Sequence, residues 1–152
     1  MKAVTLHEIT RETVRSICDL HVSKEQGKCV ASNAISIAES YFSKEAWLSA
    51  IYADETPVGF VMLWENESKG EYFLGRVMID EKYRKQRYGA KALELSIQHV
   101  REIQNAKALH LGYHEDEGSP RKFYEKFGFV DTREQTDNGE YVMTLKLSVL
   151  VG

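Results

Sequence analysis

A basic stretch that contains one glycine, Tyr83-Arg84-Lys85-Gln86-Arg87-Tyr88-Gly89-Ala90, has the residue types that bind an anion. It follows the apolar run Val77-Met78-Ile79-Asp80 and precedes an amphipathic helical pattern over residues 93–100. The N-terminus of a helix offers unpaired N–H groups and partial positive charge, and Gly89 lets the backbone approach a ligand closely. This order predicts a site for a phosphate-bearing cofactor. The alternative is an ordinary strand-to-helix turn with a solvated run of charges, because a single-glycine motif is weak evidence.

A second segment, Phe123-Tyr124-Glu125-Lys126-Phe127-Gly128-Phe129, indicates the end of a short helix, a glycine stop and the start of a strand. The helix is expected to start with Ser119 as its N-cap and Pro120 as its first residue. A helix and the strand Ala108–Tyr113 fill the space between the two segments.

Together the two segments resemble motifs of the GNAT superfamily of acetyl-CoA-dependent N-acetyltransferases. The first is similar to that family's pyrophosphate-binding motif, with Arg87 where the family usually has its first glycine. The second is similar to the family's "lYeklGF" motif. The resemblance follows the order of elements over nearly the whole chain, and it is specific over Val77–Lys91 and Ser119–Phe129. Glu117 and Pro120 stand where the family often has Asn and Ala.

The resemblance implies acetyl-CoA as the cosubstrate and assigns the residues that would bind it. The backbone of Val77, Met78 and Ile79 would hold the pantetheine arm. The pyrophosphate would be held by Arg84, Lys85, Gln86, Arg87, Tyr88, Gly89 and Ala90.

Tyr124 matches the family's general acid, which gives a proton to the departing thiolate. The alternative for Tyr124 is an aromatic residue packed in its helix. Direct transfer is expected rather than an acetyl-enzyme, because Cys18 and Cys29 fall outside the motifs.

No general base carries over from the family. In the polyamine acetyltransferases of the superfamily a carboxylate often precedes the pantetheine segment, and Gly75 occupies that position here. Glu71, Glu39, Glu115 or a chain of waters remain as candidates, each glutamate also being an ordinary surface charge.

The N-terminal third resembles bacterial spermine/spermidine acetyltransferases in Leu20–Gln26, Val30–Asn33 and Ser36–Glu39. In the superfamily this region forms the wall for the acceptor. A polyamine needs spaced carboxylates and aromatic faces for its ammonium groups. The residues expected to serve it are Glu25, Asn33 and Glu39, with Tyr41 and Trp47 as aromatic faces. An amphipathic helix with surface acids explains the same residues.

The leading interpretation is therefore an N-acetyltransferase that acts on a primary amine of a polyamine such as spermidine or spermine. A second interpretation keeps acetyl-CoA but changes the acceptor to a protein N-terminus, an amino acid or an aminoglycoside. A third is a non-catalytic acyl-CoA-binding module, which Arg87 and the absent strand carboxylate would favour.

The elements that must position these residues follow an α+β pattern. Helices are expected over Arg11–Val22, with Thr10 as N-cap, and over Asn33–Tyr41, with Asn33 or Ser32 as cap. Strands are expected at Lys2–Leu6, Ala46–Ala53, Val58–Trp64, Glu71–Ile79, Ala108–Tyr113, Val130–Glu134 and Tyr141–Leu147. A single domain over residues 1–152 is expected, because no linker or repeat interrupts the pattern. The resemblance implies the GNAT fold, a mixed, mostly antiparallel splayed sheet of about six to seven strands with about four helices on both faces.

The bulk composition excludes several classes. The net charge is −3, from 23 acidic and 20 basic residues, which argues against nucleic-acid binding. No apolar run is long enough to cross a bilayer, and the N-terminus lacks the apolar core of a signal peptide. Two cysteines make neither a disulfide framework nor a zinc site, so no metal and a cytoplasmic location are expected. A homodimer is compatible with the sequence and is not specified by it.

Overall fold

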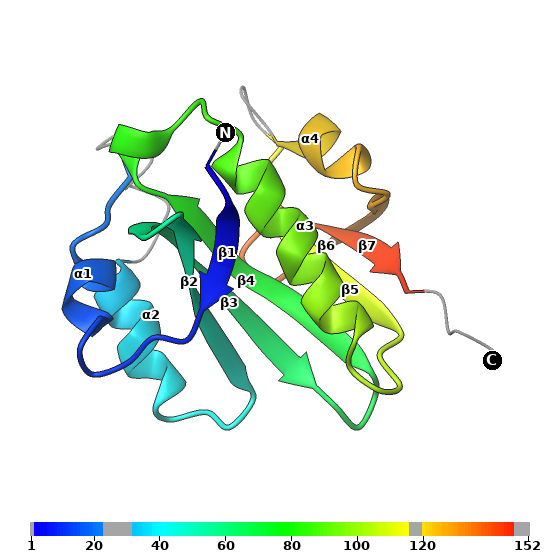
Figure 1. Cartoon of the computed structure of the whole chain (residues 1–152). Coiled ribbons are helices and arrows are strands. Elements are labelled where there is room, and N and C mark those ends of the chain that lie inside the picture. The colour runs from blue at the N-terminus through cyan, green and yellow to red at the C-terminus, as the bar shows by residue number, and fades with distance from the viewer. Residues whose placement is uncertain (1, 23–31, 116–119, 148–152) are drawn as a thin grey trace. The chain divides into compact units, whose positions relative to one another are not determined.

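The computed structural model describes residues 2–22, 32–115 and 120–147, which form seven strands, four α-helices and one short 3-10 helix (Figure 1). The strands are β1 (Val4–His7), β2 (Ala46–Ala53), β3 (Thr56–Asn66), β4 (Glu71–Ile79), β5 (Ala108–Tyr113), β6 (Val130–Gln135) and β7 (Tyr141–Lys146). The helices are α1 (Val14–Cys18), α2 (Asn33–Ser40), η1 (Glu81–Tyr83), α3 (Tyr88–Arg101) and α4 (Arg121–Glu125).

The strands form one mixed sheet in the order β1-β2-β3-β4-β5-β7-β6. β4 and β5 are parallel, and their ladder joins Glu71–Leu74 to Ala108–Leu111. Antiparallel ladders join β1 to β2, β5 to β7 and β6 to β7. A parallel pair needs a crossover connection, which α3 provides. The predicted α+β architecture with a mixed sheet and four helices is confirmed.

The chain forms two compact units, residues 1–63 with 76–96 and residues 64–75 with 97–152. β3, β4 and α3 contribute residues to both units. That the chain is one domain stays a prediction.

In the first unit, buried apolar side chains come from α1, from the two long strands β2 and β3, and from α3. The largest that are fully buried are Ile17, Ile51, Phe60, Leu63 and Leu93. α1 and α2 lie side by side, and α2 packs against β2 (Figure 1).

The first helix is shorter than predicted. It covers Val14–Cys18 and not 11–22, and Thr13, not Thr10, precedes it. Thr10 and Thr13 instead close a turn, in which the N–H of Thr10 donates to Thr13 Oγ1 at 2.9 Å and the N–H of Thr13 donates to the carbonyl of Thr10 at 3.1 Å. Threonine side chains that bond to nearby backbone compete with helix in this way. Ser32 is the cap of α2, and its Oγ accepts from the N–H of Ile35 at 3.2 Å.

In the second unit, β5 alternates half-buried and buried residues, which fits a strand with one face in a core. Its buried residues Leu109 and Leu111 lie in register with Leu145 and Met143 of β7. Pro120 is the N-cap of α4 rather than its first residue, because its ψ of 10° already lies outside the helical range. The predicted N-cap, Ser119, lies outside the described residues, as do Glu117 and Cys29.

Candidate active site

The loop that carries the basic motif runs from the end of η1 to the start of α3, within the first unit. Arg84 is extended, with φ −70° and ψ 163°, and ends η1. Lys85 and Arg87 both have φ of 64°, in the left-handed region that L-residues adopt only at a cost of roughly 1–2 kcal/mol. Arg87 stands where the resemblance places a glycine, and the loop has a positive φ there although an L-residue adopts it at a cost. The loop therefore keeps the conformation that a glycine at this position would adopt without strain.

The cations of the loop are exposed and free of carboxylates. Arg84, Lys85 and Arg87 have no ion pair with any described residue, whereas Lys91 pairs with Glu94 at 3.3 Å. Unpaired cations in one loop attract an anion, and no ion pair within the described residues has to be broken before the anion binds. This arrangement fits a pyrophosphate.

The first turn of α3 supplies backbone donors. The first helical hydrogen bond runs from the N–H of Lys91 to the carbonyl of Arg87 at 3.1 Å, so the N–H groups of Tyr88, Gly89 and Ala90 have no carbonyl one turn earlier. Among the described residues beyond its chain neighbours and its own helix backbone, a Cβ built on Gly89 would meet only Ile79 Cγ1, at 3.8 Å, so the space beside this backbone is open. Tyr88 is buried, and its hydroxyl donates to Gln86 Oε1 at 3.0 Å, which leaves the Gln86 amide nitrogen as a donor.

The end of β4 belongs to the same unit. Met78 is buried and its neighbours Val77 and Ile79 are half-buried. The carbonyl oxygen of Met78 would lie 2.3 Å from a Cβ on Gly59, so β3 approaches β4 here more closely than a side chain permits. These backbone groups are the ones expected to hold the pantetheine arm, and the structure places them next to the start of the loop.

Asp80, which sequence reasoning did not single out, fixes the junction between β4 and η1. Its side chain is 4% exposed, and its carboxylate accepts from the N–H of Lys82 and the N–H of His21, each at 2.9 Å. The N–H of Glu81 donates back to the carbonyl of His21 at 3.1 Å. An Asp that directly follows an apolar strand and precedes a turn is the signal that could have identified it.

The predicted acceptor residues have different surroundings. Asn33 is 1% exposed, and its amide nitrogen donates to the carbonyls of Ile17 at 2.8 Å and Leu20 at 3.4 Å. It also lies 3.6 Å from Met78 Sδ, so it joins α1, α2 and β4. Glu39 is exposed and has no ion pair with a described residue, and Glu25 lies outside the described residues.

Tyr124 lies on α4, in the second unit. Its ring meets Phe129 edge to face at 6.1 Å between centroids and lies 5.5 Å from Phe123. Burial raises the pKa of the Tyr124 phenol, so the hydroxyl keeps its proton at neutral pH. Its oxygen has no hydrogen bond to the residues that the structure describes.

Residues 19–129 match the acetyltransferase (GNAT) family, which is most of the chain. The chain belongs to the acetyltransferase (GNAT) family. It is 28% identical over 151 residues to the spermine/spermidine N(1)-acetyltransferase of Bacillus subtilis (strain 168), a match that covers 95% of this chain and 99% of that protein.

Solved structures share the GNAT fold. The ribosomal-protein-S18-alanine N-acetyltransferase of Escherichia coli has a TM-score of 0.73 at 15% identity, over 97% of this chain and 96% of that chain. The PaiA N-acetyltransferase of Thermoplasma acidophilum, solved in complex with coenzyme A, has a TM-score of 0.69 at 17% identity, over 95% of this chain and 99% of that chain. At such identities the likeness shows the fold alone.

This GNAT chain is therefore an acetyl-CoA-dependent N-acetyltransferase, and the non-catalytic interpretation is set aside because the curated relatives are named as N-acetyltransferases. Gly75, where the resemblance places the strand carboxylate of the polyamine acetyltransferases, lies on β4. Oε1 of Glu115 lies 3.3 Å from Nη1 of Arg133, so this carboxylate is already paired with a guanidinium. Glu71 lies 3.7 Å from His110 Nε2, and His110 Nδ1 lies 2.8 Å from Thr144 Oγ1, so a carboxylate, an imidazole and a hydroxyl form a row on the sheet.

Each unit has a hollow. The hollow of the first unit has a volume of about 410 Å³ and is lined by Lys2, Asp54, Gln86 and Tyr88. That of the second unit has a volume of about 350 Å³ and is lined by Phe73, Thr136, Asp137, Asn138 and Glu140. In the described ranges no group of histidine, cysteine, aspartate and glutamate side chains gathers to hold a metal, and no helix has the length and apolar character to cross a bilayer.

Proposed function

We propose that this enzyme acetylates a primary amine of a polyamine such as spermidine or spermine by direct transfer. The observation that carries the proposal is the full-length match to a spermine/spermidine N(1)-acetyltransferase at 28% identity. The negative net charge, −3, is compatible with a cationic acceptor.

On the cofactor side, each group of this chain has one task. The cations and N–H groups of Arg84–Ala90 bind the pyrophosphate, and the backbone of Val77–Ile79 orients the pantetheine arm. Acetyl-CoA supplies the activated acetyl group when it is bound. Tyr124 holds a proton at its phenol oxygen for the leaving sulfur, and its raised pKa keeps that proton in place until a strong base develops beside it.

On the acceptor side, the proposal uses one unpaired carboxylate and two that line a hollow, of which that of Glu140 also lies 3.9 Å from His114 Nε2. Glu39 is exposed on α2 and free of cations among the described residues. The hollow of the second unit combines the carboxylates of Asp137 and Glu140 with the ring of Phe73, a combination that suits ammonium groups. Glu25 and Asn33 stay proposed acceptor residues, and the burial of Asn33 favours a role in shaping the wall.

One observation favours a second candidate, an acceptor that carries a carboxylate, such as an amino acid. Arg76 directly precedes Val77 on β4, and burial lowers the pKa of its half-buried guanidinium. Its buried Nε has no hydrogen-bond partner among the residues that the structure describes. An anionic acceptor would give this cation a partner.

An amine panel with release of coenzyme A as the readout distinguishes the candidates. We expect a higher kcat/KM for spermidine and spermine than for lysine, short peptides or aminoglycosides. Glu39→Gln is expected to raise KM for spermine more than for a simple monoamine. Only the polyamine has a second ammonium group whose ion pair with Glu39 would be lost. Glu45→Gln is the matched control, since Glu45 is also exposed and unpaired in the described structure. No polyamine preference, or an equal effect of Glu39→Gln on all amines, would refute the polyamine assignment.

The cytoplasmic location and a homodimer stay predictions.

A further inference from the structure

The helix that carries Tyr124 is too short to be stable alone. α4 has five residues, and its N-cap Pro120 makes no side-chain cap hydrogen bond. Isolated helices below about 12–15 residues are marginal in water, so tertiary contacts must hold this one. Aromatic contacts to Phe123 and Phe129 hold one side of the Tyr124 ring, but ring contacts alone tolerate rotation of the helix.

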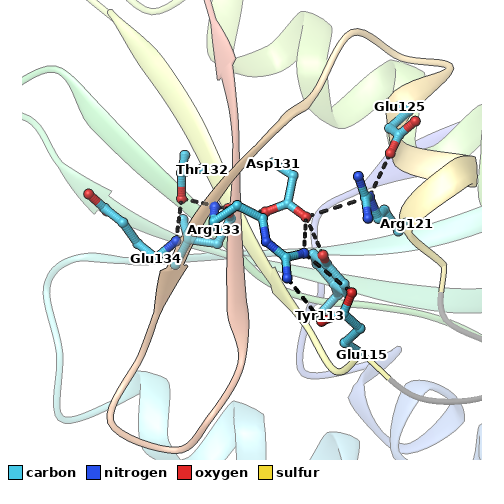
Figure 2. A network of polar contacts seen from close by, with 9 residues as sticks. Tyr113, Glu115, Arg121, Glu125, Asp131, Thr132, Arg133 and Glu134 are labelled. Atoms are coloured by element: carbon cyan, nitrogen blue, oxygen red, sulfur yellow. Dashed lines mark hydrogen bonds and ion pairs between the residues drawn. The ribbon is translucent and has the colours of Figure 1, made fainter.

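Arg121 connects the polar side of α4 to β6 through ion pairs. Its Nε lies 2.8 Å from Glu125 Oε1 on the same helix and 3.5 Å from Asp131 Oδ2 on β6 (Figure 2). Figure 2 shows Arg121 between the two carboxylates, so one guanidinium links the helix to the strand.

Asp131 itself has several polar partners. Its side chain is 6% exposed, its Oδ1 accepts from the N–H of Arg133 at 2.8 Å, and its Oδ2 lies 3.3 Å from Arg133 Nη1. The hydroxyl of Tyr113, at the end of β5, also donates to Oδ2. Burial alone would raise the pKa of Asp131, but the hydrogen bonds from Tyr113 and Arg133 hold it below its ordinary value, so the carboxylate is ionised at neutral pH.

Arg133 is fixed in turn by its surroundings. Both of its terminal nitrogens lie 3.3 Å from the carboxylate of Glu115, and its guanidinium carbon lies 4.5 Å from the centroid of the Tyr141 ring. Its φ of 61° falls where the pairing of β6 with β7 is irregular, between Asp131 and Gln135. Such irregularities aim a side chain out of the regular ladder, here toward Asp131.

We propose that Arg121 and Asp131 are positioning residues that fix the orientation of α4 and thereby the direction of the Tyr124 phenol. This inference rests on the proposed role of Tyr124 as the general acid. The Arg121 side chain is 44% exposed, and exposed ion pairs contribute little to stability. Loss of the Arg121 side chain is therefore expected to change the direction of the Tyr124 phenol without unfolding the helix.

The test compares Arg121→Gln with Lys122→Gln, which removes the same charge from the next residue of the helix, where no ion pair to a described residue is lost. Each is made in the wild-type and the Tyr124→Phe background, with the amine that the panel shows to be best, so the acceptor assignment does not enter. We expect Arg121→Gln to lower kcat about tenfold in the wild-type background, with acetyl-CoA affinity unchanged. In the Tyr124→Phe background it is expected to lower kcat no further, and Arg121→Lys is expected to restore part of the activity.

A second measurement does not depend on turnover. In enzyme labelled with 3-fluorotyrosine, the ¹⁹F resonance lost in Tyr124→Phe reports the surroundings of the Tyr124 ring. We expect Arg121→Gln and Asp131→Asn to shift or broaden that resonance and Lys122→Gln to leave it unchanged.

The outcomes are distinguishable. Wild-type kcat in Tyr124→Phe would refute the general acid, and the positioning role with it. If Tyr124→Phe is slow but Arg121→Gln lowers kcat equally in both backgrounds, or leaves the resonance in place, the positioning role alone is wrong and the acid role stands.

Discussion

At Gly89, the addition of one methyl group is expected to affect acetyl-CoA binding and folding stability differently. Apart from its chain neighbours and its own helix backbone, a Cβ at Gly89 would meet no atom of the described residues closer than 3.8 Å, and alanine is the better helix former by about 1 kcal/mol. We therefore expect Gly89→Ala to keep or raise the melting temperature while it weakens acetyl-CoA binding, because the methyl group occupies the side from which the phosphate approaches.

Gly59→Ala is the contrasting variant. Its Cβ would lie 2.3 Å from the carbonyl oxygen of Met78, so it should lower the melting temperature, since overpacking costs about 1–3 kcal/mol. Calorimetry with acetyl-CoA and thermal unfolding of both variants check the pair. Unchanged affinity in Gly89→Ala would remove this turn from the cofactor site.

Arg87 combines strain with charge, and a glycine substitution tests both. Arg87→Gly should raise stability by about 1 kcal/mol because the left-handed backbone no longer carries a side chain. It should also weaken acetyl-CoA binding and lessen its dependence on salt, because a cation is lost. Asn105→Gly is the control for the gain in stability, since Asn105 has a φ of 68° and lies outside the loop. If Arg87→Gly binds acetyl-CoA more tightly, the side chain does not hold the cofactor and the arginine is a tolerated, strained substitution.

Among the elements, η1 and the end of β4 depend on one buried carboxylate. Asp80→Ala would leave the N–H groups of His21 and Lys82 without their acceptor, at a cost of about 1–3 kcal/mol each. We expect a lower melting temperature and weaker acetyl-CoA binding, because η1 leads into the basic loop. Asp80→Asn should lose less, since one oxygen remains, and Glu81→Gln should have no effect. Wild-type affinity in Asp80→Ala would show that the loop is ordered without this anchor.

The elements that the sequence predicted best are those with a strong period or a clear boundary. The strands over Ala46–Ala53, Glu71–Ile79 and Ala108–Tyr113 have the predicted bounds. The first helix was overestimated because its apolar spacing hides the turn that Thr10 and Thr13 close. Periodicity reports which face is buried and does not report local side-chain competition for the backbone.

The residues of the candidate site were also predicted only in part. The loop was predicted from consecutive residues, whose order alone indicates a helix N-terminus. Asp80 and Asp131 were missed because their partners come from elsewhere in the chain, and a single sequence does not show such pairs. Asp80 binds His21, 59 positions away, and Asp131 binds Tyr113, 18 positions away.

At the scale of the molecule, pH is expected to act on stability through buried groups whose pKa values are shifted in opposite directions. The pKa of Asp131 is lowered in the folded state, so its contribution to stability is present above the unfolded value of about 3.9 and is lost as pH falls through the folded pKa. Burial raises the pKa of Tyr113 and Tyr124, so their contribution is present below about 10 and is lost as pH rises through their folded values.

Melting temperature should therefore be flat from about pH 7 to 9 and fall on both sides, and the acid fall should begin below about 6.5, because burial lowers the pKa of His99. Asp131→Asn should flatten the acid side, and Asp137→Asn, an exposed control, should not. An acid limb that is identical in wild type and Asp131→Asn would contradict this assignment. Turnover should rise across the flat range as the acceptor amine loses its proton, because Tyr124 stays protonated there.

The ends of the strand order also bear on aggregation. β1 has four residues, and β6 has a left-handed residue, irregular pairing and an almost wholly exposed run that includes Arg133 and Glu134. Short, charged or irregular edges are poor templates for a foreign strand. Two copies of this chain are therefore expected not to join by extending their sheets, and the amide exchange rates of Val130–Gln135 should stay the same as the protein is concentrated.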